Sequence, residues 1–140
     1  MEPVLGAQEM LALQEIVRKV PASDYCVNYV ARLVRSTRPH EKSAPQFIRD
    51  WVLWGVGPRG GQALLMAARA RAALDGRPEV DVDDIKAMAT AVLRHRVVLN
   101  YNAESLGETS ETVIKRLMAE IPTADVDRKT RERVESVLKV

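Results

Sequence analysis

Apolar residues with helical spacing, divided into short segments by prolines and glycines, constrain the fold of this chain more than any other feature. One helix face, with i, i+3, i+4, i+7 spacing, is formed by Leu13, Ile16, Val17 and Val20. Pro21 ends this first segment, because proline cannot continue a helix interior. Similar spacing recurs along the chain. The sequence therefore predicts short amphipathic helices packed into an all-α bundle.

Six helices are expected before residue 122, over 7–19, 23–38, 46–54, 58–74, 81–96 and 109–121. Ser23 is placed to cap the second helix, and Asp81 with Asp84 to cap the fifth. A short strand over 97–99 is expected to pair near Val80. The predicted fold is a helical bundle of five to seven helices with room for one very short two-stranded ribbon. We expect residues 1–122 to form its domain and 123–140 to form a charged helix or tail.

The inward faces follow from the same spacing. They comprise Cys26, Tyr29, Val30 and Leu33 in the second helix, Ala63, Ala67, Ala70 and Leu74 in the fourth, Ile85, Met88, Ala89 and Val92 in the fifth, and Ile114, Leu117, Met118 and Ile121 in the sixth.

Composition narrows the possible classes of protein. The 140 residues suit one domain, with 46% hydrophobic residues but only 4% aromatic ones. The 21 basic and 19 acidic residues give a net charge of +2, which argues against a dedicated nucleic-acid module. A single cysteine excludes an internal disulfide and, with two histidines, argues against a structural zinc site. No membrane span or signal peptide is evident, so we expect a cytoplasmic protein.

Enzymatic motifs are weak in this sequence. The phosphate loop G-x-x-x-x-G-K-[ST] is absent. His40 and His95 have no evident carboxylate partner in the sequence. Asp81, Asp83 and Asp84 could suggest a magnesium site, but we favour helix capping as the explanation. No metal site is therefore predicted.

The segment 57–61 (Gly-Pro-Arg-Gly-Gly) is the most informative part of the sequence. Pro58 suits the first position of a helix, whose free N–H groups favour anions. Arg59 adds a cation suited to phosphate oxygens. Gly60 and Gly61 are poor helix formers, which suggests that something approaches the turn closely. These residues fit either an anion site or a tight turn with a solvated arginine.

Other candidates have simpler structural explanations. Trp51 and Trp54 precede the turn, and we interpret them as anchors of a short helix to the core, with ligand stacking as the alternative. Cys26 is interpreted as a small buried apolar residue. The 94–96 segment (Arg-His-Arg) suits a helix C-terminus, or could reach a phosphate or an acidic surface.

Several segments in order resemble the lid domain of MoxR-type AAA+ ATPases. They are 11–17 leading to Val20-Pro21, 29–38, 54–59, 76–77, 82–85, 92–96 and 100–104 followed by Gly107. The resemblance covers about residues 8–122 and implies that Arg59 is the sensor 2 arginine, reaching the phosphates of ATP bound to a preceding core domain. Gly57, Pro58 and Gly60 would then border the nucleotide. The family commonly has alanine where this chain has Gly60.

The resemblance also implies the setting of the domain. It predicts a lid fragment of a longer ATPase that uses ATP and Mg²⁺, contacts its N-terminal core domain and neighbouring subunits of a ring, often a hexamer, and has a chaperone-like role. A von Willebrand factor A-domain protein is an implied partner. We expect the lid alone not to hydrolyse ATP. The alternatives are a small helical nucleic-acid-binding module or a protein-interaction module using 125–140.

Overall fold

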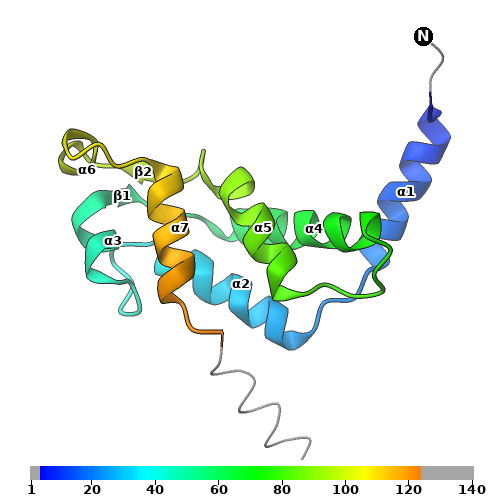
Figure 1. The fold of residues 1–140 in the computed structure, drawn as a ribbon, viewed down its shortest axis with the longest axis horizontal. Helices are drawn as coiled ribbons and strands as arrows, with labels where there is room; N and C mark the ends of the chain where they lie inside the picture. The colour runs from blue at the N-terminus through cyan, green and yellow to red at the C-terminus, as the bar shows by residue number, and fades with distance from the viewer. Residues whose placement is uncertain (1–3, 124–140) are drawn as a thin grey trace, which may run out of the picture.

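The computed structural model describes residues 4–123, so the segment predicted as a charged helix over 125–140 lies outside the described residues. Its architecture is helical, with one antiparallel ribbon of two short strands, which confirms the predicted fold class (Figure 1). None of the described helices has the length and hydropathy of a membrane span. The helices are α1 (Ala7–Lys19), α2 (Asp24–Ser36), α3 (Gln46–Trp51), α4 (Pro58–Leu74), α5 (Val82–Leu93), α6 (Tyr101–Ser105) and α7 (Ser110–Glu120).

The core lies between α2, α4, α5 and α7. Its fully buried side chains include Leu33, Leu64, Ile85 and Leu117, one from each of these helices. Every inward residue predicted for the second helix is buried in α2. The prediction for the sixth helix is confirmed in α7, where Met118 is the one partly buried member. Amphipathic spacing therefore located most of the core.

The inward face of α4 was predicted wrongly. Its buried residues are Gly60, Leu64, Ala68 and Ala72. The predicted alanines are only partly buried, and Leu74 is 88% exposed. Small apolar residues occur on several faces of α4, so their periodicity alone cannot identify the side that is buried. Apart from Leu64, the residues of the true face are also small, which allows α4 to pack closely against α5.

The two-stranded ribbon joins β1 (Val52–Trp54) to β2 (Val98–Leu99) in antiparallel register. The expected helix over 46–54 therefore ends at Trp51, and the last three residues are extended. The predicted pairing of 97–99 with Val80 is also wrong, because Val80 forms an isolated parallel bridge with Ala22. A strand this short is stabilised by its partner rather than by its own sequence.

The helix α6 follows β2 and was not predicted. Asn100 caps it by accepting a hydrogen bond from the Ala103 N–H (3.0 Å). The Asn100 side-chain amide also donates to the Asp50 carbonyl (2.6 Å), and its backbone N–H to that of Trp51 (2.9 Å). These bonds fasten α6 and the ribbon to the end of α3.

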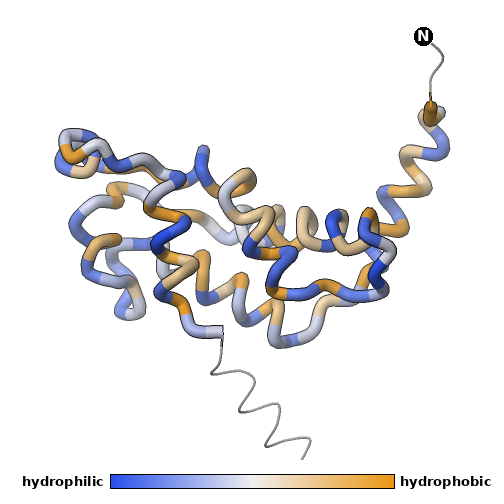
Figure 2. Tube along the Cα trace, viewed as in Figure 1, coloured by the Kyte–Doolittle hydropathy of each residue, from blue (hydrophilic) through white to orange (hydrophobic). Residues whose placement is uncertain are grey.

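The helix α1 has the predicted bounds but a different setting. It projects from one end of the bundle, and much of it has no other element beside it (Figure 1). Apolar segments of α1 are therefore uncovered (Figure 2), and Leu13 and Ile16 are exposed. Its C-terminal end lies against α4, where the Arg69 guanidinium donates to the Arg18 carbonyl (3.4 Å). The amphipathic pattern was correct, but most of the helix lies outside the core.

Candidate functional site

The first turn of α4 is an uncapped helix N-terminus. Gly57 is the N-cap residue in an extended conformation and has no side chain to satisfy the first N–H groups. Pro58 occupies the first helical position, as predicted, and lacks an N–H of its own. The Arg59 N–H has no hydrogen-bond acceptor within residues 4–123. The partial positive charge of a 17-residue helix is thus open to an external anion.

The Arg59 side chain is exposed at this N-terminus. Among the described residues, no carboxylate lies within ion-pair distance of its guanidinium, and no hydrogen bond engages it. Gly57 and Pro58 are exposed beside it. A permanent cation and the free Arg59 N–H at one helix start can bind phosphate oxygens by charge-assisted hydrogen bonds.

Gly60 lies beneath this surface and is buried. A Cβ at this position would overlap Cγ1 of Val56 and lie 3.2 Å from Cδ of Arg96. A Cβ at Gly61 would make only ordinary contacts, at 3.4 and 3.5 Å, with side chains of α2. The close approach expected at these glycines therefore comes from the protein's own core. Glycine at position 60 therefore leaves the room that the Val56 side chain occupies.

Arg96 supplies a second cation close to the turn. It follows α5, which ends at Leu93, so the 94–96 segment lies just beyond the helix rather than in its last turn. The Arg96 side-chain stem packs beside Gly60, and its Nε donates to the Val92 carbonyl (3.2 Å). Arg94 instead pairs with Glu111 (3.0 Å). Of the two arginines, only Arg96 borders the first turn of α4.

The connector before α4 is held by residues that sequence reasoning did not single out as functional. The Val56 N–H donates to Oγ1 of Thr37 (2.8 Å), and Nε of Arg38 donates to the Val56 carbonyl (2.8 Å). A Cβ at Gly55 would overlap the Thr37 carbonyl oxygen and lie 2.8 Å from Cα of Arg38. The only signal in the sequence was the 29–38 segment, which ends in Thr37-Arg38 and was noted for family resemblance.

The acidic cluster at the start of α5 has a structural role. Asp81 and Asp84 form a capping box, as predicted. Asp84, 2% exposed, accepts two hydrogen bonds from the Arg77 guanidinium, one of 2.7 Å, and lies 3.3 Å from Nε of Arg71. The bond from Arg77 lowers the pKa of Asp84, while Asp84 raises that of Arg77. No group of three or more potential metal ligands occurs in the described part of the chain.

The two tryptophans differ. Trp51 packs edge-on against Phe47, with ring centroids 5.7 Å apart, and Arg116 lies over both rings. Its predicted anchoring role is confirmed. Trp54 is 70% exposed, so the same prediction for it is wrong. The change from α3 to β1 explains the error, because Val52 takes the buried position of the strand.

Cys26 is buried, as expected, and its thiol donates to the Val80 carbonyl (3.3 Å). Burial raises the pKa of this thiol, which favours its protonated form. It borders a hollow of about 450 Å³ that also includes Arg77. Neither this hollow nor the one described next includes a residue of the 57–61 turn.

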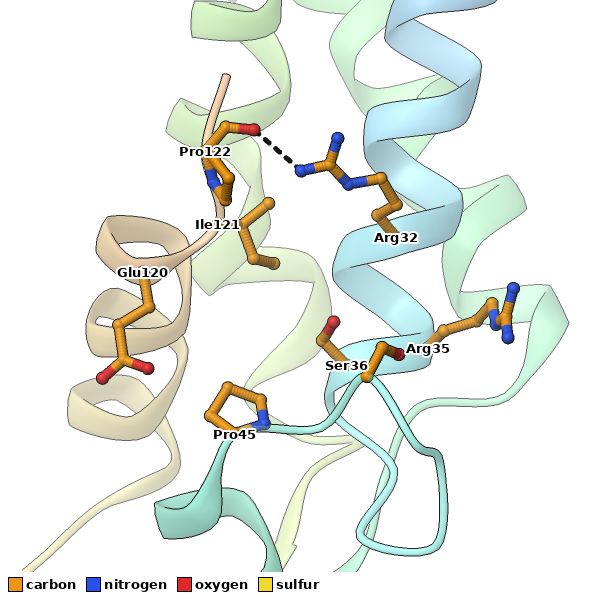
Figure 3. Close-up of a pocket in the computed structure, with 8 residues that line it drawn as sticks. Arg32, Arg35, Ser36, Pro45, Glu120, Ile121 and Pro122 are labelled. Carbon is orange, nitrogen blue, oxygen red and sulfur yellow. Dashed lines mark hydrogen bonds between the residues drawn. The ribbon is translucent and has the colours of Figure 1, made fainter. Parts of the chain in front are cut away.

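A second hollow, of about 300 Å³, lies between α2 and the end of α7 (Figure 3). Its two arginines are already engaged. Arg32 donates to the Pro122 carbonyl (2.8 Å), and Arg35 points away from Pro122 and pairs with Glu41 (3.2 Å). The described chain thus offers its unpaired arginine at the α4 turn rather than in either hollow.

Comparison with known proteins gives a consistent result. The family model for the AAA lid domain matches residues 48–117, half of the chain. Chaperone MoxR1 of Mycobacterium tuberculosis is 33% identical over 124 residues, which are 89% of this chain and 33% of that protein. The uncharacterised protein YeaC of Bacillus subtilis is 34% identical over 121 residues, 86% of this chain and 35% of that protein.

A solved structure supports the fold. The crystal structure of a protein from Cytophaga hutchinsonii, assigned as an ATPase, superposes with a TM-score of 0.76 at 29% identity. The match covers 82% of this chain and 35% of that one. The chain therefore spans about a third of the length of the relatives it matches.

Proposed function

The chain belongs to the AAA lid domain family, as the lid of a MoxR-type AAA+ ATPase, and on this premise we propose that Arg59 is its sensor 2 residue. The observation that carries the proposal is an exposed arginine, without a partner among residues 4–123, at the uncapped start of α4. In the whole protein this arginine contacts phosphate oxygens of ATP bound to a core domain. A preorganised cation there stabilises the charge that develops during phosphoryl transfer.

The rest of the proposal follows from the family. The core domain binds ATP and Mg²⁺. This chain contributes Arg59 to the phosphates, and Gly57 and Pro58 border the nucleotide above the buried Gly60. The lid also meets neighbouring subunits of a ring, a hexamer in the form common for the family. It couples ATP hydrolysis to a chaperone-like activity, with a von Willebrand factor A-domain protein as partner. The cytoplasm is the expected location.

Substitution of Arg59 tests its role. In the full-length ATPase, Arg59→Ala should lower kcat about 100-fold, because one preorganised donor to the transition state is lost. The matched control is Arg49→Ala, which removes an exposed arginine of α3 whose guanidinium, within the described part of the chain, donates only to the Lys42 carbonyl. Steady-state hydrolysis under saturating ATP and Mg²⁺ is the measurement. Turnover equal to that of the control would refute the sensor role.

Nucleotide binding by the 140-residue chain tests whether ATP binding depends mainly on the core domain. We expect weak or undetectable heat in a titration with ATP and Mg²⁺, because most phosphate contacts belong to the core domain. A submicromolar Kd for this chain alone would contradict the lid function.

A further inference from the structure

We propose that Thr37 and Arg38, at the end of α2, are the positioning residues of Arg59. This inference rests on the proposed sensor function and adds the residues that aim the sensor. Neither side chain bonds to Arg59 itself. They act on Val56, three residues earlier, by holding both of its backbone polar groups.

The bonds form a continuous connection between two helices. The Thr37 hydroxyl donates to the Val34 carbonyl inside α2 (2.6 Å) and accepts from the Val56 N–H (2.8 Å). Arg38 then donates through Nε to the Val56 carbonyl (2.8 Å). Thr37 and Arg38, at the end of α2, thus fix both the position and the orientation of Val56.

Burial makes this connection stiff. Thr37 is 1% exposed and Val56 is fully buried, so water cannot replace the bond between them. Gly55 brings the connector so close to the backbone of Thr37 and Arg38 that no side chain fits between. The connector therefore has little room for an alternative path.

Val56 lies only three residues before Arg59, so the position of Val56 affects that of the sensor arginine. Only Gly57 separates Val56 from Pro58, and the proline ring fixes one of the remaining backbone angles. Gly60 packs on the Val56 side chain from the other side. A shift of Val56 would consequently turn the first turn of α4 and displace Arg59. Misplacement of a catalytic group by about 1 Å can cost about 100-fold in rate.

The expected effect is on catalysis through Arg59. In the full-length ATPase, Thr37→Val, which removes the hydroxyl at constant shape, should lower kcat about tenfold with little change in KM for ATP. Thr37→Ser, which keeps the hydroxyl, should restore most of the activity. Arg38→Ala should also lower kcat. Its control is Arg35→Ala, because both arginines contact Glu41 but only Arg38 reaches Val56.

A double-mutant cycle separates positioning from general damage. If Thr37 and Arg38 act through Arg59, then Thr37→Val and Arg38→Ala should have no further effect on kcat in an Arg59→Ala background. Losses that multiply with that of Arg59→Ala would overturn the positioning role and leave the sensor role intact. An unchanged kcat for Arg59→Ala alone would instead remove the sensor role, and with it this inference. Arg38 is partly exposed, so its variant keeps the test usable if Thr37→Val fails to fold.

Discussion

The two ends of α4 use arginine in opposite ways. At the N-terminal end, Arg59 is exposed and has no partner among residues 4–123. Near the C-terminal end, Arg71 and the following Arg77 converge on the buried carboxylate of Asp84. An arginine therefore stabilises the fold where a carboxylate lies within ion-pair distance, and it remains available to an outside anion where none lies within that distance.

The two ends are also supported differently. The C-terminal end is held by ion pairs to Asp84, whereas the N-terminal end is held by the hydrogen bonds of Thr37 and Arg38 to the Val56 backbone and by close packing at Gly55. Support of this kind positions a cation without neutralising it. A carboxylate in the same place would fix the turn but compete with phosphate for Arg59.

The largest effect is expected from Gly55→Ala. The added Cβ would meet backbone atoms of Thr37 and Arg38, which cannot move as a flexible side chain can. We expect a loss of about 3 kcal/mol in the free energy of unfolding, measured by urea denaturation of the 140-residue chain. Gly57→Ala is the control, because none of the described residues has an atom within 4 Å of a Cβ there. Equal stability of the two variants would show that the connector is not tightly held.

A smaller loss is expected from Asp84→Asn, which removes the charge but leaves an acceptor for the cap. At pH 7 we expect a loss of about 2 kcal/mol, because a buried carboxylate is exchanged for a neutral group beside two arginines. Asp83→Asn, at an exposed neighbour, is the control.

The pH dependence follows from the lowered pKa of Asp84. The unfolded chain binds this proton more readily, so the stabilisation is complete above the unfolded pKa of about 4 and is lost as the pH falls through the lower folded value. The stability difference between wild type and Asp84→Asn should therefore shrink below about pH 4. A difference that is constant from pH 7 to pH 3 would argue against the ion pair as its source.

The smallest effect is expected from Arg59→Ala, which should change stability by less than about 0.5 kcal/mol. Arg77→Ala, at the opposite end, should destabilise the chain more than Arg59→Ala does, because it leaves Asp84 with fewer partners. Thermal unfolding of both variants makes the comparison directly. If Arg59→Ala destabilises the chain as much as Arg77→Ala, the two ends do not differ as described.

Local signals predicted much of the fold and the centre of the candidate site. The bounds of α1 and α4 agree with expectation, and the caps at Ser23 and Asp81 were identified. These features depend on residues within one or two turns of each other. The position of Arg59 at a helix start was predicted for the same reason.

Features that depend on distant partners were missed. The strand β1 forms because β2, more than 40 residues later, pairs with it, and this left Trp54 exposed rather than buried. The bonds of Thr37 and Arg38 to Val56 span about 18 residues and involve backbone groups that every sequence contains. The buried face of α4 was also missed, because alanines occur around the helix and its packing against neighbouring helices decides which of them are buried.

Because α1 contacts α4, a small tilt of α4 would produce a larger displacement of α1. At a rise of 1.5 Å per residue, the 17 residues of α4 form a rod of about 25 Å. Arg59 is at one end of this rod, and the contact of Arg69 with the end of α1 lies toward the other. A tilt of about 10° at the arginine end would move the far end by about 4 Å, and α1, which projects beyond it, would sweep further still.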